Sequence, residues 1–145
     1  MVELVSVAEI LDAICDDKSL KLFNAIATKG GNSGDLSVQL KLSRKEYYSR
    51  MSRLMKTGIV KRKNGKHFLT AFGKVVYDAQ ATIRKAVESY WKLKAIDSID
   101  FSDDITVNER NKLIDTLLDD LEIKEILSKH ASWIVNITFY KIFEN

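Results

Sequence analysis

The chain has 145 residues, of which 46% are hydrophobic, so it can form a hydrophobic core and is not expected to be disordered as a whole. It contains no apolar run near the roughly 18 residues that a membrane span needs. Residues 1–17 are acidic, whereas a secretory signal peptide has a basic region followed by an apolar one. We therefore expect a soluble, cytoplasmic protein. The single cysteine, Cys15, excludes a disulfide within the chain and a cysteine-rich zinc site, and is expected to be a small buried residue on a helix.

The net charge of +3 hides an uneven distribution along the chain. Residues 41–85 hold thirteen Lys or Arg and two acidic residues, whereas residues 97–125 hold ten acidic and three basic residues. A basic block beside an acidic one predicts that one part of the molecule carries a surface for a polyanion. On charge alone, an ordinary solvated charged face is as good an explanation as a surface that binds a polyanion.

Four helices are predicted before residue 57. A capping box at residues 6–9 opens a helix over about 7–15, and Asp17 can cap a second helix that Gly30-Gly31 ends. A brief helix over about 35–40 follows. A second capping box, Ser43 to Glu46, then opens a helix that runs to about Lys56.

The segment 59–69 predicts a two-stranded hairpin, because Asn64-Gly65 suits a type I′ turn, in which both central residues have positive φ. Thr70 can cap a long helix over about 71–96. The order is helix, helix, short turn, helix, basic hairpin and long helix. This is the layout of a winged helix-turn-helix, so the fold class is mainly α with a small β-hairpin wing.

In helix-turn-helix modules the second helix of the pair enters the major groove, and nearby cations hold phosphates. The candidate is the helix over 43–56, whose Tyr47, Met51 and Leu54 share one face, with Met55 beside them, and are expected to pack inward. Glu46 is explained as a cap. The candidates for contact with DNA bases are Arg44, Lys45, Tyr48, Ser49, Ser52 and Arg53.

The hairpin is too small to have a core of its own, yet it is densely basic. A wing along the DNA backbone or minor groove would give its cations a partner and release counterions. His67 is at best a phosphate donor and is more simply read as a packed or exposed imidazole. The candidates for phosphate contact are Lys56, Lys61, Arg62, Lys63, Asn64 and Lys66.

Two stretches carry a family resemblance. Residues 42–60, LSRKEYYSRMSRLMKTGIV, resemble the recognition helix and its exit into the wing in ArsR-like and MarR-like regulators, and residues 68–73, FLTAFG, resemble the exit from the wing in many archaeal and bacterial winged-helix proteins. The resemblance covers about residues 17–77. It implies transcription regulation, with DNA contacts at Arg44, Lys45, Tyr48 and Ser49 and at residues 62–66. The cysteine motif of metal-sensing members is missing, which argues against metal sensing by that route.

A heptad-like seam runs along the predicted helix over 71–96. It indicates a homodimer, with a helix folded back on its own domain as the alternative. A two-fold dimer would present two recognition helices to half-sites about 10 base pairs apart. The seam residues are Phe72, Val76, Ala79, Ile83, Ala86, Tyr90 and Leu93.

The last third of the chain is acidic, and a third capping box, Thr106 to Glu109, predicts a helix over about 107–121 with a short helix after it, to Ser128. The apolar stripe expected to face inward is Leu113, Leu117, Leu118 and Leu121. The segment 133–143 is apolar and is compatible with a strand or a buried helix. The aspartates at 97, 100, 103 and 104 lack the spacing of a calcium loop and are read as an acidic linker.

These patterns predict a DNA-binding domain over 1–70, a linker and dimerisation helix over 71–96, and an acidic helical extension over 97–145. The extension could take an unidentified effector or protein partner. No catalytic constellation, metal or cofactor motif is found, so we expect no enzyme. The leading hypothesis is a sequence-specific regulator that binds double-stranded DNA. The alternative is a winged helix that contacts proteins of the transcription or replication machinery and binds DNA only non-specifically.

Overall fold

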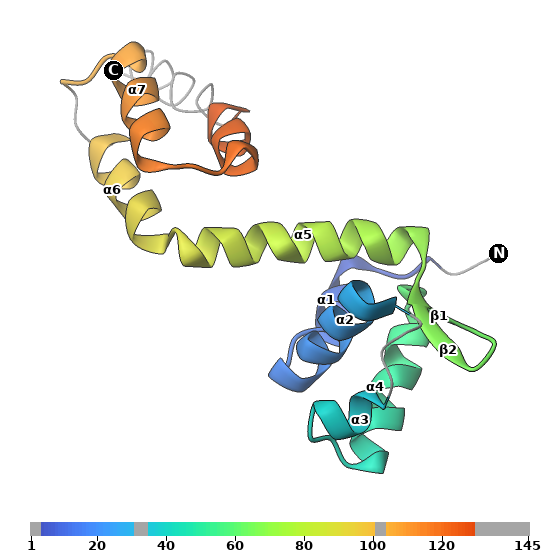
Figure 1. Ribbon diagram of the computed structural model, residues 1–145. Helices are drawn as coiled ribbons and strands as arrows, with labels where there is room; N and C mark the ends of the chain where they lie inside the picture. The colour runs from blue at the N-terminus through green and yellow to red at the C-terminus, as the bar shows by residue number, and fades with distance from the viewer. Residues whose placement is uncertain (1–3, 31–34, 101–103, 130–145) are drawn as a thin grey trace. The chain divides into compact units, whose positions relative to one another are not determined.

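The computed structural model describes residues 4–30, 35–100 and 104–129. This part of the chain is mainly helical and contains one small two-stranded antiparallel sheet (Figure 1). The chain divides into two compact units, residues 1–80 and 81–145, and each is described by itself. None of the helices in the described ranges is long and apolar enough to cross a membrane.

The helices of the first unit begin where short polar side chains can cap them. The capping box at Ser6 is present in full, as expected, whereas the second helix is capped by Asp16, one residue before the predicted Asp17. The Asp16 side chain accepts both the backbone N–H and the hydroxyl of Ser19, which explains the shift. Gly30 ends this helix with a positive φ of 56°. The four helices are α1 Val7–Ala13, α2 Asp17–Lys29, α3 Leu36–Gln39 and α4 Arg44–Lys56.

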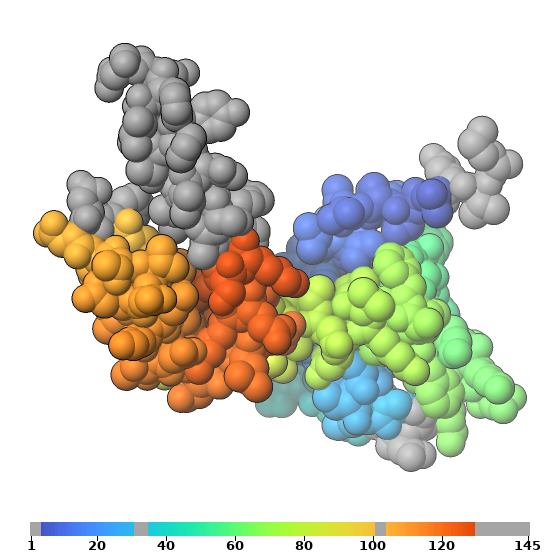
Figure 2. All heavy atoms as spheres, turned by 90° about the horizontal axis from the view of Figure 1, so that it is seen from above, coloured from blue at the N-terminus to red at the C-terminus, as the bar shows by residue number. Residues whose placement is uncertain are grey.

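The hairpin confirms the prediction from Asn64-Gly65. Strand β1, Val60–Lys63, pairs antiparallel with β2, Lys66–Leu69, and the two turn residues have φ of 52° and 74°. Positive φ at both positions is what a type I′ turn requires. The tip of the hairpin protrudes from the first unit, as the green spheres of Figure 2 show.

One hydrophobic core holds the first unit together. Phe23 and Leu54 are fully buried in it, and the ring of Tyr77 meets that of Phe23 edge-on at 6.2 Å. The start of α5, Ala71–Glu88, therefore packs on this core. Members of the core come from α1, α2, α3, α4 and β1, and include Ile10, Leu22, Phe23, Ile26, Leu36, Met51, Leu54, Ile59 and Val60.

The single helix predicted over 71–96 is wrong. The structure has α5 up to Glu88 and a separate α6, Tyr90–Asp100, with a change of direction at Ser89 (Figure 1). The bend has a physical reason in packing. Ala86 at the end of α5 and Leu93 on α6 both contact the core of the second unit, whose buried members are Ile96, Ile114, Leu118 and Ile123.

The second unit also contains α7, Val107–Leu117, which Thr106 caps as predicted, and a helical segment over 121–129. Of the expected inward stripe, Leu118 is buried, but Leu113 is 37% exposed and Leu121 is 74% exposed. Leu117 packs against the core as predicted, but Leu113 and Leu121 do not belong to the buried cluster. On α7 the buried position is Ile114, next to Leu113, and Leu121 lies after the end of α7, where Ile123 is the buried residue. The segment 133–143 lies outside the described residues.

A nearly buried ion pair joins the two ends of the α6–α7 connection. The guanidinium of Arg110 donates to both carboxylate oxygens of Asp100, with Nη2 at 3.0 Å from Oδ2. Asp100 was interpreted from the sequence as part of an acidic linker, but its carboxylate forms an ion pair with Arg110. No group of three acidic, histidine or cysteine side chains that could hold a metal occurs among the residues the structure describes.

The predicted dimerisation seam does not form one continuous exposed stripe. Val76 packs on the first core, and Ala86 and Leu93 pack on the second. The large seam side chains that remain exposed are Phe72, Ile83 and Tyr90. Ala79 is exposed as well. Cys15, expected to be buried on a helix, is exposed just after α1 ends, and its Sγ lies 3.9 Å from Oδ1 of Asp12.

Candidate nucleic-acid interface

The outward face of α4 is the first part of the candidate interface. Ser43 Oγ accepts the N–H of Glu46 at 3.1 Å, and the Glu46 carboxylate accepts the N–H of Ser43 at 2.9 Å, so the start of the helix is fixed. Met51 and Leu54 hold the inner face in the core. Because side chains three or four residues apart share a face, the opposite face points to solvent.

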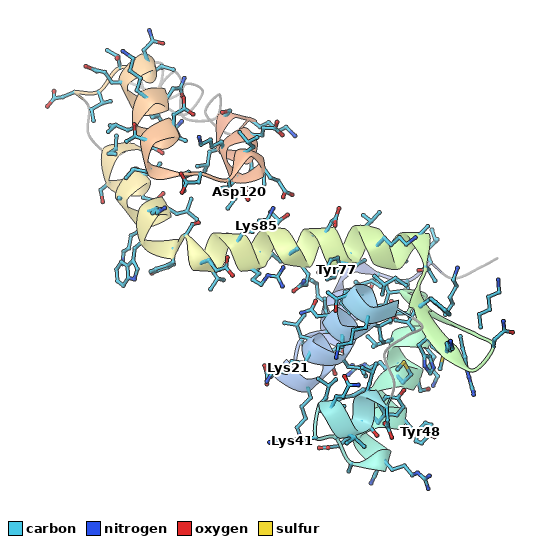
Figure 3. All side chains as sticks on the ribbon, viewed as in Figure 1. Lys21, Lys41, Tyr48, Tyr77, Lys85 and Asp120 are labelled. Atoms are coloured by element: carbon cyan, nitrogen blue, oxygen red, sulfur yellow. The ribbon has the colours of Figure 1, made fainter. Side chains whose placement is uncertain are left out.

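The predicted base-contact residues divide into groups on this helix. Lys45 and Ser49 are exposed on the outward face together with Lys56, and Ser52 is half-buried at its edge. Arg44 and Tyr48 lie on one flank, where Tyr48 is 62% exposed and its ring meets the ring of Tyr47 edge-on at 5.4 Å. Figure 3 shows Tyr48 on α4 and Lys41 in the turn that precedes the helix.

Met55 was expected to pack inward and instead is 37% exposed. The reason is its angular position, which places it with Arg44 and Tyr48 rather than between Met51 and Leu54. An exposed thioether thus lies beside the exposed tyrosine. This flank is more apolar than the sequence pattern predicts.

The other flank of α4 is a row of ion pairs to α1 and to the start of α2. Arg50 lies 3.3 Å from Asp16, and Arg53 pairs with Asp12. Glu46 lies 2.6 Å from Lys18 Nζ. Arg53, a predicted base contact, is thus engaged within the protein. The signal for this row was present in the sequence, because residues 46, 50 and 53 recur at helical spacing, but their acidic and basic partners are distant in the chain.

Glu46 has the most strongly shifted pKa of this surface. The hydrogen bond from the Lys18 ammonium, followed by that from the Ser43 backbone N–H, lowers its pKa from the usual 4.5 to about 2. Both donors stabilise the carboxylate form. Glu46 is therefore ionised throughout the neutral range and belongs to the scaffold of α4.

This shift makes a prediction about acid stability. A carboxyl group whose pKa is lowered in the folded state stabilises the fold above the unfolded pKa, and this contribution is lost as the pH falls through the folded pKa. We expect Glu46→Gln to be less stable than the wild type at pH 7, with the difference shrinking between pH 4.5 and about 2. Urea unfolding midpoints measured across this range test it.

Glu9 provides the matched control, because it closes the capping box of α1 without a lysine in the described structure. Its pKa is also lowered, chiefly by the backbone N–H of Ser6. Glu9→Gln should therefore show the same pH trend with a smaller amplitude. Equal amplitudes for the two variants would show that the Lys18 bond contributes nothing.

The hairpin is the second part of the candidate interface, and its cations lie on two faces. Directly paired residues of an antiparallel ribbon share a face, and the faces alternate along each strand. Arg62 pairs with His67 on one face, whereas Lys61 pairs with Phe68 on the other. The pKa of Tyr47 on α4 is raised, chiefly by burial of its ring. Arg62 is close enough to α4 to oppose part of this rise.

His67 carries no positive charge at neutral pH. Burial, and then the neighbouring Arg62, lowers the pKa of its imidazole below the usual 6.5. As a phosphate contact it could donate a hydrogen bond only. This agrees with the minor role expected from the sequence.

Apart from Arg50 and Arg53 of the ion-pair row, the basic side chains of α4 and the hairpin lack carboxylate partners in the described structure. Within the described residues, none of them forms an ion pair, although acidic side chains are available elsewhere on the first unit. The first unit therefore presents a group of uncompensated cations on neighbouring elements, since α4 packs against β1. These are Arg44, Lys45, Lys56, Lys61, Arg62, Lys63 and Lys66. Asn64 lies exposed at the tip between them.

Comparison with known proteins adds no assignment. No protein-family model, no curated protein and no solved structure matches the chain. The function of the chain is therefore inferred from the geometry and charge of the described residues.

Proposed function

We propose that the first unit is a winged helix-turn-helix that binds duplex DNA, with α4 in the major groove and the hairpin as the wing. The protein would act as a sequence-specific, non-enzymatic transcriptional regulator. One observation carries this proposal. The hairpin cations and the α4 cations Arg44, Lys45 and Lys56 have no carboxylate partner in the described part of the chain. Arg50 and Arg53, on the other flank of α4, are paired. Duplex DNA supplies closely spaced phosphates to such a surface.

The division of α4 assigns different roles to its residues. Lys45 and Ser49 lie on the outward face near the N-terminal half, which usually penetrates the groove, so we propose them as base contacts. Arg44 and Tyr48 flank them. Arg53 is paired with Asp12 and supports the position of the helix instead. Arg62 and Lys66 of the hairpin would contact DNA phosphates beside the major groove.

Selection of bound duplexes from a random library tests the proposal. We expect a selected site to bind at least about 1,000-fold more tightly than random duplex near 150 mM salt, as specific regulators do. Lys45→Ala or Ser49→Ala should change the selected sequence, whereas Lys21→Ala, on the exposed side of α2, should leave it unchanged. A selected site that binds no better than random DNA would favour the alternative function in protein contacts.

The same selection also addresses the proposed homodimer. Phe72, Ile83 and Tyr90 are exposed apolar residues of the predicted seam. If two copies associate through them, the selected sequences should contain two inverted half-sites about 10 base pairs apart. A single half-site would contradict dimeric binding without touching the proposal that the first unit binds DNA.

A further inference from the structure

An exposed apolar strip runs along one flank of α4, beside the face proposed to contact DNA. It consists of Tyr48, which is 62% exposed, and Met55, which is 37% exposed. The two residues are seven positions apart and therefore share one side of the helix, next to the outward face that carries Lys45 and Ser49. Neither side chain belongs to the core of the first unit. Apolar surface left in water at this place indicates a binding surface.

The ring of Tyr48 is held in position by its neighbour. It meets the ring of Tyr47 edge-on, with 5.4 Å between the ring centroids and 77° between the ring planes. Tyr47 is partly buried and packs against the core of the first unit. The contact with this anchored ring restricts the orientations of Tyr48, so less conformational freedom is lost when Tyr48 binds something.

The two apolar residues differ in their place along the helix. Tyr48 is in the N-terminal half of α4, the half that usually penetrates the major groove in helix-turn-helix modules. Met55 lies about 10 Å further along the helix axis, next to the last residue of α4. In the proposed complex, Tyr48 is consequently the apolar side chain that is placed to reach the edge of a base.

The major groove offers one apolar group to such a ring. The base edges there carry hydrogen-bond donors and acceptors, except that thymine also presents the methyl group on its C5 atom. Cytosine has a hydrogen atom at C5, and 5-methylcytosine has the same methyl group as thymine. A ring packed against this methyl group removes apolar surface of both partners from water. A pyrimidine without the methyl group leaves part of the ring exposed.

We propose that Tyr48 binds the C5-methyl group of a pyrimidine in the major groove. The protein would then select thymine, or 5-methylcytosine, at one position of its site. This inference rests on the proposed function and adds the chemical group that one residue recognises. Lys45 and Ser49 contact the polar base edges, whereas the ring of Tyr48 contacts the methyl group. If the flank instead docks a protein, DNA binding will not depend on this methyl group.

Replacement of thymine by uracil tests the contact, because the two bases differ only in the C5-methyl group and both pair with adenine. The full chain is titrated with duplexes of the selected site in which each thymine in turn is replaced by uracil. At one position we expect uracil to raise the Kd about fourfold, the effect of burying one methyl group. At that position, 5-methylcytosine should bind about fourfold more tightly than cytosine.

Three variants of α4 separate the methyl contact from other roles of the flank. Tyr48→Ser should bind the thymine and uracil duplexes equally. Tyr48→Phe should keep the difference of about fourfold, because the ring rather than the hydroxyl group makes the contact. Met55→Gln is the matched control on the same flank and should also keep the difference. The readout is the ratio of two Kd values for each protein, so a uniform loss of affinity does not alter it.

Four outcomes would overturn the proposal while leaving DNA binding intact. The first is a selected site that contains no thymine, and the second is a site in which no uracil replacement weakens binding. The third is a difference between thymine and uracil that persists in Tyr48→Ser. The fourth is loss of the difference in Tyr48→Phe, which would assign the contact to the hydroxyl group. Absence of binding to any duplex would contradict both the proposed function and this inference.

Discussion

Gly73→Ala is expected to lower the free energy of unfolding of the first unit by about 3 kcal/mol, the upper end of the usual cost of overpacking. A Cβ at this position would lie 1.9 Å from the carbonyl oxygen of Ile59 and 2.8 Å from its carbonyl carbon. These are backbone atoms, so no side-chain rotation can relieve the clash. The start of α5 would have to move, which disturbs the Thr70 N–H to Ile59 carbonyl bond of 3.1 Å.

The sign of this effect is informative because helix propensity predicts the reverse. In an exposed helix, Gly to Ala would stabilise by about 1 kcal/mol. Gly58→Ala is the matched control, since its φ is 80° but its added Cβ would meet nothing within 4 Å. It should cost about 1 kcal/mol through backbone strain alone. The neighbouring change Lys74→Ala should stay within about 0.5 kcal/mol.

The measurement must report on the first unit. Both tryptophans, Trp91 and Trp133, come after residue 80 in the sequence, so tryptophan fluorescence is unsuitable as a probe of the first unit. Native-state hydrogen exchange at core amides such as Leu54 gives the stability of the first unit directly. A Gly73→Ala protein as stable as the wild type would show that α5 does not approach Ile59 so closely.

The second large effect concerns DNA. Arg44→Glu combined with Lys45→Glu is expected to weaken binding to any duplex about 100-fold near 100 mM salt, because two cations that face the DNA become anions, which its phosphates repel. The two positions are the first residues of α4. Acidic side chains there interact favourably with the helix dipole. The fold should consequently be as stable as the wild type or slightly more stable, so a loss of binding is not a loss of structure.

Lys92→Glu with Lys94→Glu makes the same change of net charge on α6 of the second unit and serves as the control. It should weaken DNA binding by less than about threefold, since neither lysine belongs to the proposed DNA interface. The salt dependence should follow the same division. The negative slope of log K against log salt should become less steep by about 2 for the α4 variant and should stay unchanged for the α6 variant.

Local signals in the sequence predicted most of the helix starts and the hairpin turn. The capping boxes at Ser6, Ser43 and Thr106 and the Asn64-Gly65 turn are all present, because each depends only on residues a few positions apart. The helix over 71–96 failed for the opposite reason. A periodic pattern continued through Ser89, but the packing of Ala86 and Leu93 on a separate core set the bend.

For the candidate site, too, the features set by local sequence could be predicted and those set by tertiary contacts could not. Exposure of Lys45, Ser49 and the hairpin cations follows from periodicity, whereas the pairing of Arg53 with Asp12 depends on the tertiary approach of α4 to α1. A groove lined by the end of α2, the hairpin and the start of α5, including Lys74, is a further case. No local pattern in the sequence predicts which side of a basic ribbon faces another helix.

The most direct test of the central claim is the affinity of the wild type for a random-sequence duplex of about 30 base pairs, measured from 50 to 300 mM salt. Contacts from α4 and the hairpin to four or five phosphates predict a slope of log K against log salt of about −4, lost in part in the Arg44→Glu, Lys45→Glu variant. A slope near zero, or no binding at 50 mM salt, would contradict the proposal that this surface binds DNA.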